Sequence, residues 1–140
     1  MTAAGNTEYG IIGRGSFSGI KERPLHWVGS SKKDLLAFPG QVVDDFGYAL
    51  SVVQRGGAPP SATTWKGEGP GVFELVEEHR GDAFRAVYTV RFEKAVYVLH
   101  CFQKKSPTGV RTARQDVNLI HERLRMAQRD YEVRYGRKED

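Results

Sequence analysis

The sequence predicts an α+β fold in which a small, mainly antiparallel sheet packs against helices. Residues 32–54 and those after 112 carry apolar residues at helical spacing, whereas apolar and polar residues alternate between 72 and 103. The 140 residues fit one domain, and a hydrophobic content of 39% allows a buried core. The predicted order is a strand, a helical hairpin, a three-stranded meander and a C-terminal helix. We expect the helices to cover one face of the sheet and to leave the other for a partner or a substrate.

The N-terminal half predicts a tail, one strand and two helices. Residues 1–23 are rich in glycine and show neither helical nor strand periodicity of apolar residues. We therefore expect a flexible tail before a domain over 24–134. Residues 25–28 form a short strand. Ser31 and Asp34 have the spacing of a capping box, and the helix over 32–38 that they open must end before Pro39. A second helix over 41–54 carries one apolar stripe.

The C-terminal half predicts the meander and the last helix. A loop over 58–71 precedes strands over 72–78, 83–92 and 95–103, which short turns connect. The third strand is apolar on both faces and is therefore expected at the centre of the sheet. Thr112 and Gln115 have capping-box spacing, which predicts that the final helix begins after Thr112. Residues 135–140 form a charged tail.

Several classes of protein are excluded by composition. No apolar run approaches the roughly 20 residues of a membrane helix, and no secretory signal is visible. The single cysteine, Cys101, cannot form an internal disulfide, which suits the cytoplasm. The four histidines lie far apart without metal-ligand spacing, so we expect no metal and no other cofactor.

The charge pattern is typical of a surface that binds a polyanion, or of a solvated surface that keeps the protein soluble. The net charge is +4, and residues 95–140 hold 10 Lys and Arg against 6 Asp and Glu. Arg85 faces away from the apolar side of its strand, and antiparallel pairing brings it near Lys104 and Lys105 at the end of the next strand. Such cations stabilise the charge that develops on phosphate when a 2′-hydroxyl cleaves RNA.

A simpler interpretation of the same cations stays open. Arg85 and Lys104 could pair across strands with the carboxylates of Glu74, Glu77 or Asp82, and then have a structural role only.

The segment from His79 to Gly109, HRGDAFRAVYTVRFEKAVYVLHCFQKKSPTG, resembles the RelE/ParE toxin superfamily. It is most similar to the phage-derived, HigB-like branch of type II toxin–antitoxin toxins, and the resemblance extends over roughly residues 24–130. It implies a RelE-like fold and a toxin that cleaves mRNA without a metal, on the ribosome. The implied partners are mRNA, the ribosome and an antitoxin, commonly a helix-turn-helix protein.

The resemblance also implies site residues. Arg85 matches the strand arginine that faces RNA, and Lys104 and Lys105 match the basic pair ending the next strand, so these three are the catalytic candidates. Lys66 and Arg80 resemble basic positions flanking that surface. With Arg111 and Arg114, which belong to an acid-free basic segment, they are the RNA-binding candidates.

One part of the family pattern has no clear match. Many RelE-type nucleases carry a tyrosine, or a His/Asp/Tyr group, near the C-terminus, where this chain reads Gln115-Asp116-Val117. Tyr131, Tyr135 and His100 are candidates, and the general base stays unassigned. Two alternatives to an endoribonuclease therefore stay open: a non-enzymatic, ParE-like poison of DNA gyrase, and a nucleic-acid-binding module without catalysis.

Overall fold

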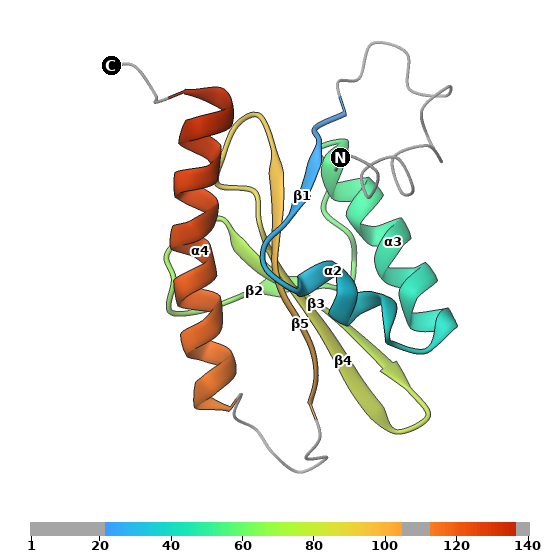
Figure 1. The fold of residues 1–140 in the computed structure, drawn as a ribbon. Helices are drawn as coiled ribbons and strands as arrows, with labels where there is room; N and C mark the ends of the chain where they lie inside the picture. Colours follow the sequence, from blue (N-terminus) through green and yellow to red (C-terminus); the bar gives the residue numbers. More distant parts are fainter. Residues whose placement is uncertain (1–21, 105–112, 137–140) are drawn as a thin grey trace.

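The computed structural model of the chain describes residues 22–104 and 113–136 (Figure 1). Most of the predicted N-terminal tail, Lys105, Arg111 and residues 137–140 lie outside this part. The elements follow in the order β1 (Leu25–Trp27), α2 (Ser31–Leu36), α3 (Gly40–Gln54), β2 (Ala62–Thr64), β3 (Val72–His79), β4 (Asp82–Thr89), β5 (Val96–Lys104) and α4 (Arg114–Tyr135).

Within the described residues the strands form one five-stranded sheet in the order β1-β5-β4-β3-β2. β1 pairs in parallel with β5, and the other three pairs are antiparallel. The fold is therefore α+β with a mainly antiparallel sheet, as predicted, and its layout is that of a small RelE-like domain. β5 lies between β1 and β4, which confirms the central position that its apolar pattern predicted. No helix in the described ranges is long and apolar enough to cross a membrane.

One face of the sheet is covered by the helical hairpin of α2 and α3. The apolar stripe predicted for the second helix is buried there, with Val42, Phe46 and Leu50 almost without solvent exposure. It packs on β3 and β4 side chains such as Leu75 and Ala86. The spacing of three and four residues places the whole stripe on one side of α3, so the hairpin closes this half of the core.

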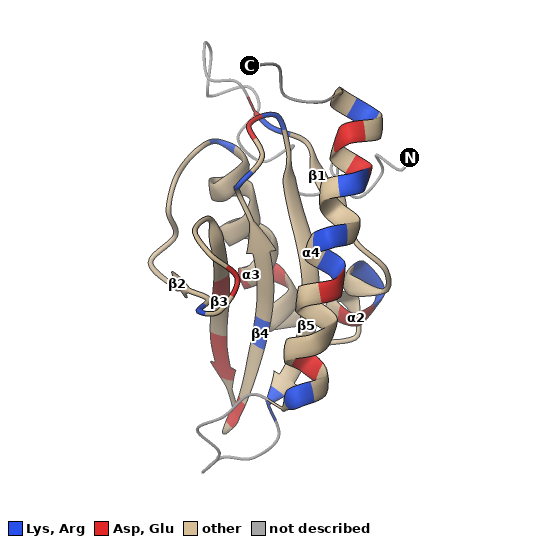
Figure 2. Ribbon diagram, turned by 90° about the vertical axis from the view of Figure 1, so that its left-hand side faces the viewer, with Lys and Arg blue, Asp and Glu red and all other residues tan. Residues whose placement is uncertain are grey.

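The opposite face is covered in part by α4, and our expectation that this face stays open is wrong in that respect. Ile120, Leu124 and Ala127 pack against β5 residues, including Tyr97 and Leu99. The physical reason lies in β5 itself, since a strand that is apolar on both faces needs cover on both. Figure 2 shows α4 lying over β5, with β3 and β4 beside the helix and not beneath it.

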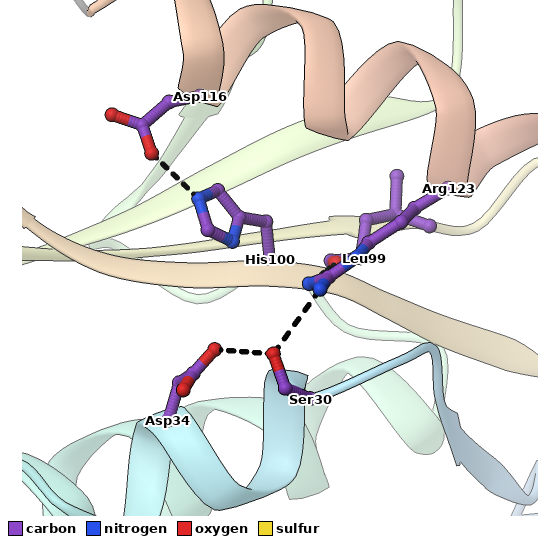
Figure 3. Close-up of polar contacts among 6 residues, drawn as sticks. All are labelled: Ser30, Asp34, Leu99, His100, Asp116 and Arg123. Atoms are coloured by element: carbon purple, nitrogen blue, oxygen red, sulfur yellow. Dashed lines mark hydrogen bonds and ion pairs between the residues drawn. The ribbon is translucent and has the colours of Figure 1, made fainter.

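Arg123 adds a polar connection beneath α4. Its guanidinium donates hydrogen bonds to the carbonyl of Leu99 in β5 (3.0 Å) and to Oγ of Ser30 before α2 (3.1 Å) (Figure 3). Ser30 in turn donates to Asp34. Gly29 has φ +56, and a Cβ there would lie 2.9 Å from Arg123 Nη2, so the close approach requires glycine. The helix is thus tied to both the sheet and the hairpin.

Three local predictions differ from the structure. The segment expected as loop contains β2, whose three residues are too few to show an alternating pattern. α2 begins after Ser30 without a side-chain cap, because the Ser31 hydroxyl donates to the carbonyl of Val98 and no capping box forms there. α4 begins after Ala113, and Thr112, the predicted capping residue, lies outside the described residues. The long predicted strand ends at Thr89, whose hydroxyl accepts the backbone N–H of Arg91.

The packing of α4 predicts a large effect of one substitution. Ile120 is fully buried, so Ile120→Ala should lower the free energy of unfolding by about 2–5 kcal/mol. Val133 on the same helix is 86% exposed, and Val133→Ala is the matched control, with an expected change near zero. Urea unfolding followed by circular dichroism measures both. Equal stability of the two variants would contradict the docking of α4 on the sheet.

Candidate active site

On the side of α4, the sheet carries three rows of opposed residues that run across β3, β4 and β5. Strand register aligns Glu74 and Val87 with His100, Val76 and Arg85 with Phe102, and Glu78 and Ala83 with Lys104. Directly opposed residues point to the same face. The structure therefore brings together, on the side of α4, a group that we call the β3–β5 face: Glu74, Arg85, His100, Phe102 and Lys104.

Arg85 forms an ion pair on this face. Its Nη1 donates to Oε1 of Glu74 at 2.7 Å, and both side chains are largely shielded from solvent. This is one of the cross-strand pairings that the sequence left open as an alternative role. The pair leaves Nε of Arg85 buried and without a hydrogen-bond partner among the described residues. Arg85 is thus held in place and still has an unused donor.

A β-bulge directs His100 toward α4. Tyr88 pairs with Val98 and Val87 pairs with His100, so β5 has one extra residue, Leu99, at this point. Leu99 and His100 consequently both lie on the α4 side. Cys101 points to the opposite core, as strand alternation predicted, and burial raises the pKa of its thiol. His100 and Cys101 therefore cannot act as a nucleophile pair.

Two contacts fix the His100 imidazole, one at a ring nitrogen and one on the face of the ring. Nε2 lies 2.7 Å from Oδ1 of Asp116 in the first turn of α4. The ring stacks on Phe102, with 4.8 Å between centroids and 16° between planes. Nδ1 points away from Asp116, is buried, and has no hydrogen-bond partner in the described part of the chain (Figure 3). An imidazole held through one nitrogen leaves the other free for proton transfer.

Asp116 is the residue that sequence reasoning missed. By sequence alone, the segment Gln115-Asp116-Val117 offers no clear substitute for the family's C-terminal group. Asp116 has His100 as a partner because the first turn of α4 lies over the bulge in β5. The available signal was its place near the start of the helix, which by itself indicates no more than a favourable interaction with the helix dipole.

The remaining basic candidates are spread along the sheet. Arg80 lies in the β3–β4 turn, at the same end as Lys104, and Arg114 is exposed at the start of α4. Lys66 follows β2 at the opposite end, where Trp65 pairs with Val72. The eight residues of β3 separate the two ends by about 26 Å. Lys66 and Arg80 therefore cannot contact the same phosphate.

The two C-terminal tyrosines lie away from the β3–β5 face. The Tyr131 hydroxyl accepts the backbone N–H of Lys94, and the Tyr135 hydroxyl lies 2.8 Å from Nε2 of His26. Both contacts are at the end of the sheet where β5 begins, whereas His100 lies toward its other end. Along α4, Asp116 and Tyr131 are about 22 Å apart. The tyrosines thus pack the helix against the sheet and lie far from His100.

The described residues include no group of three or more His, Cys, Asp or Glu side chains that could hold a metal ion.

With this geometry established, the comparisons with known proteins place the chain in a family. A model of the phage-derived Gp49-like proteins (DUF891) matches residues 33–125, a segment that contains the whole β3–β5 face and Asp116. The chain belongs to the Gp49-like family. These proteins are placed in the RelE/HigB-like group of toxin–antitoxin toxins, which supports a toxin-like function and an antitoxin partner for the Gp49-like chain. The comparisons found no curated protein and no solved structure that matches it.

The tyrosine end of the molecule predicts a pH dependence. Burial, with a smaller contribution from the charge of Arg134, lowers the pKa of His26 below its usual value. An unfolded histidine titrates near pH 6.5, so between about pH 6.5 and the lowered pKa the unfolded chain binds a proton that the folded protein does not. Stability should therefore fall as the pH drops through this window. His26→Gln should flatten the profile measured by urea unfolding, and a slope like that of the wild type would contradict the assignment.

Proposed function

We propose that this Gp49-like protein is a toxin that cleaves mRNA on the ribosome by metal-free attack of a 2′-hydroxyl at the β3–β5 face. The observation that carries the proposal is a pair of buried nitrogens, Arg85 Nε and His100 Nδ1, without partners in the described chain. They lie in neighbouring rows of one face, beside the carboxylate of Glu74. Buried polar atoms without partners call for an explanation, and a phosphodiester would supply acceptors for both.

The three side chains have the properties that this cleavage needs. Glu74 accepts the proton of the 2′-hydroxyl as its oxygen attacks phosphorus. His100, protonated at Nδ1, donates a proton to the departing 5′-oxygen as the bond from phosphorus to that oxygen breaks. Arg85, between them in the next row, stabilises the charge on the phosphoryl oxygens. The products are a 2′,3′-cyclic phosphate and a 5′-hydroxyl, so atoms and charges balance without a metal.

The spacing of the strands suits these roles. Glu74 on β3 and His100 on β5 flank Val87 on β4, which puts their backbones about 10 Å apart. A phosphate seated between the two side chains would have the base on one side and the acid on the other. Asp116 acts as a positioning residue, since it fixes the ring so that Nδ1 is the free nitrogen. Phe102, which stacks on the face of the ring, helps to hold the plane of the imidazole.

The other basic residues extend the surface. Lys104 in the next row, with Lys105, adds positive charge at the scissile phosphate, while Arg80 and Arg114 lie at the same end of the sheet. With Lys66 and Arg111, they are proposed to hold the RNA backbone. An antitoxin, of the helix-turn-helix type common in this branch, would neutralise the protein in the cytoplasm by covering this face.

Expression in a bacterium tests the proposal. Induction of the wild-type protein should arrest growth and create new mRNA 5′ ends within translated codons. Arg85→Ala, Glu74→Gln and His100→Gln should each reduce these ends about 10²–10⁴-fold, because each loses charge stabilisation or proton transfer. A Lys104→Ala/Lys105→Ala pair should also lose cleavage. Glu93→Gln, an exposed carboxylate in the β4–β5 turn, is the control that should cleave normally.

The same experiment separates the alternatives. Growth arrest with intact mRNA and a DNA-damage response would overturn the proposal in favour of a gyrase poison. Salt-sensitive binding of RNA without any cut product would favour a binding module. Full cleavage by folded Glu74→Gln and His100→Gln proteins, checked by circular dichroism, would refute the proton-transfer roles.

A further inference from the structure

A second concave surface lies on the flank of α4 that faces β2, β3 and β4. It is a groove of about 350 Å³ between the helix and the loop that follows β2. Leu124 contributes an apolar contact, and three arginines line the walls: Arg91, Arg125 and Arg129. None of the three was among the candidate residues taken from the sequence.

Arg91 is fixed in position by the loop. Its Nε and Nη2 donate to the carbonyl of Pro70 at 3.1 and 2.9 Å, and Nη2 also donates to the carbonyl of Glu68. Gly71, with φ +86, lets the loop come this close, because a Cβ there would lie 3.2 Å from Arg91 Cα. Backbone carbonyls do not neutralise a guanidinium. Arg91 therefore presents a held positive charge to the groove.

The helix side of the groove carries two further cations. Arg125 and Arg129 are exposed and one turn apart, and the structure shows no ion pair between either of them and a described carboxylate. Like charges four residues apart destabilise a helix slightly. The one acid of the groove, Glu68, is mostly shielded and lies 3.1 Å from Nδ1 of His121. The groove thus carries arginine charges without a carboxylate partner among the described residues. Its own carboxylate, Glu68, already contacts His121.

We propose that this groove, defined by Arg91, Arg125 and Arg129, binds the phosphate backbone of RNA at a site separate from the β3–β5 face. Guanidinium groups match the oxygens of a phosphodiester in geometry and charge. The choice of RNA rests on the proposed function, because the groove is lined by α4 and by the loop after β2, and this loop lies on the same side of α4 as β3 and β4 (Figure 2). Arg85 and Arg91 are six residues apart along the chain, about 20 Å if extended, so one RNA strand could contact both.

Binding of a non-cleavable RNA tests the groove independently of catalysis. The probe is a short 2′-O-methyl oligoribonucleotide, which lacks the attacking hydroxyl, and fluorescence anisotropy with the full chain gives the Kd over a range of salt concentrations. Arg125→Gln and Arg129→Gln should each raise the Kd about 3–10-fold. Each should also make the dependence of the log association constant on log salt concentration shallower, with a slope smaller in magnitude by about 0.7. Lys33→Gln, which removes one exposed charge from α2 on the opposite face, is the matched control and should leave the slope unchanged.

The outcomes distinguish this proposal from that of RNA cleavage. Reduced binding in the two arginine variants, with Lys33→Gln like the wild type, supports the groove whether or not the wild-type protein cuts RNA. Affinities and slopes equal to those of Lys33→Gln overturn the groove and leave the cleavage proposal standing. If the wild-type protein does not bind the probe, the groove is not an RNA site. If the arginine variants lose only the binding of the antitoxin, the groove binds an acidic peptide instead.

Discussion

The docking of α4 across β5 determines how the functional surfaces are arranged. Ile120, Leu124 and Ala127 bury against a strand that is apolar on both faces, and Arg123 adds hydrogen bonds to that strand and to the start of α2. Burial of aliphatic side chains gives most of the free energy of such a contact. The helix covers β5 and stops short of β4 and β3. No helix therefore covers β3 and β4 on this side of the sheet.

The same contact assembles the candidate active site from distant parts of the chain. Asp116 reaches His100 because the N-terminal turn of α4 lies over the bulge in β5. Glu74 and Arg85 come from the two strands that the helix leaves uncovered. A carboxylate, an imidazole and a guanidinium on one rigid sheet face form a set that can accept a proton, donate a proton and stabilise phosphoryl charge. The rigidity comes from strand pairing, which fixes the rows in which these residues stand.

Several features could be predicted from sequence because they depend on local pattern. The apolar stripe of α3 and the central place of β5 follow directly from periodicity. Because β5 is apolar on both faces, it needs a second layer of helix, and α4 supplies it. The prediction of an open face overlooked this requirement. β2 could not be seen, since three residues at an edge carry no periodicity.

The site was harder to predict than the fold because its parts meet through tertiary contacts. Strand alternation could place Arg85 on the face opposite Phe84 and Tyr88, and the sequence also indicated cross-strand pairing with Glu74 as one alternative. The bulge at Leu99 shifts the register by one residue, and no local signal in the sequence marks it. The contact between His100 and Asp116 joins two positions whose closeness depends on where α4 crosses the sheet.

The chemical nature of the cut ends tests the proposed mechanism most directly. Purified protein is incubated with ribosomes that carry a defined mRNA, and the termini of the fragments are identified by mass spectrometry. Attack by the 2′-hydroxyl, with Glu74 as base and His100 as acid, predicts a 2′,3′-cyclic phosphate on one fragment and a 5′-hydroxyl on the other. A 3′-hydroxyl with a 5′-phosphate would mean that water, not the 2′-hydroxyl, attacks the phosphorus, and would contradict the mechanism.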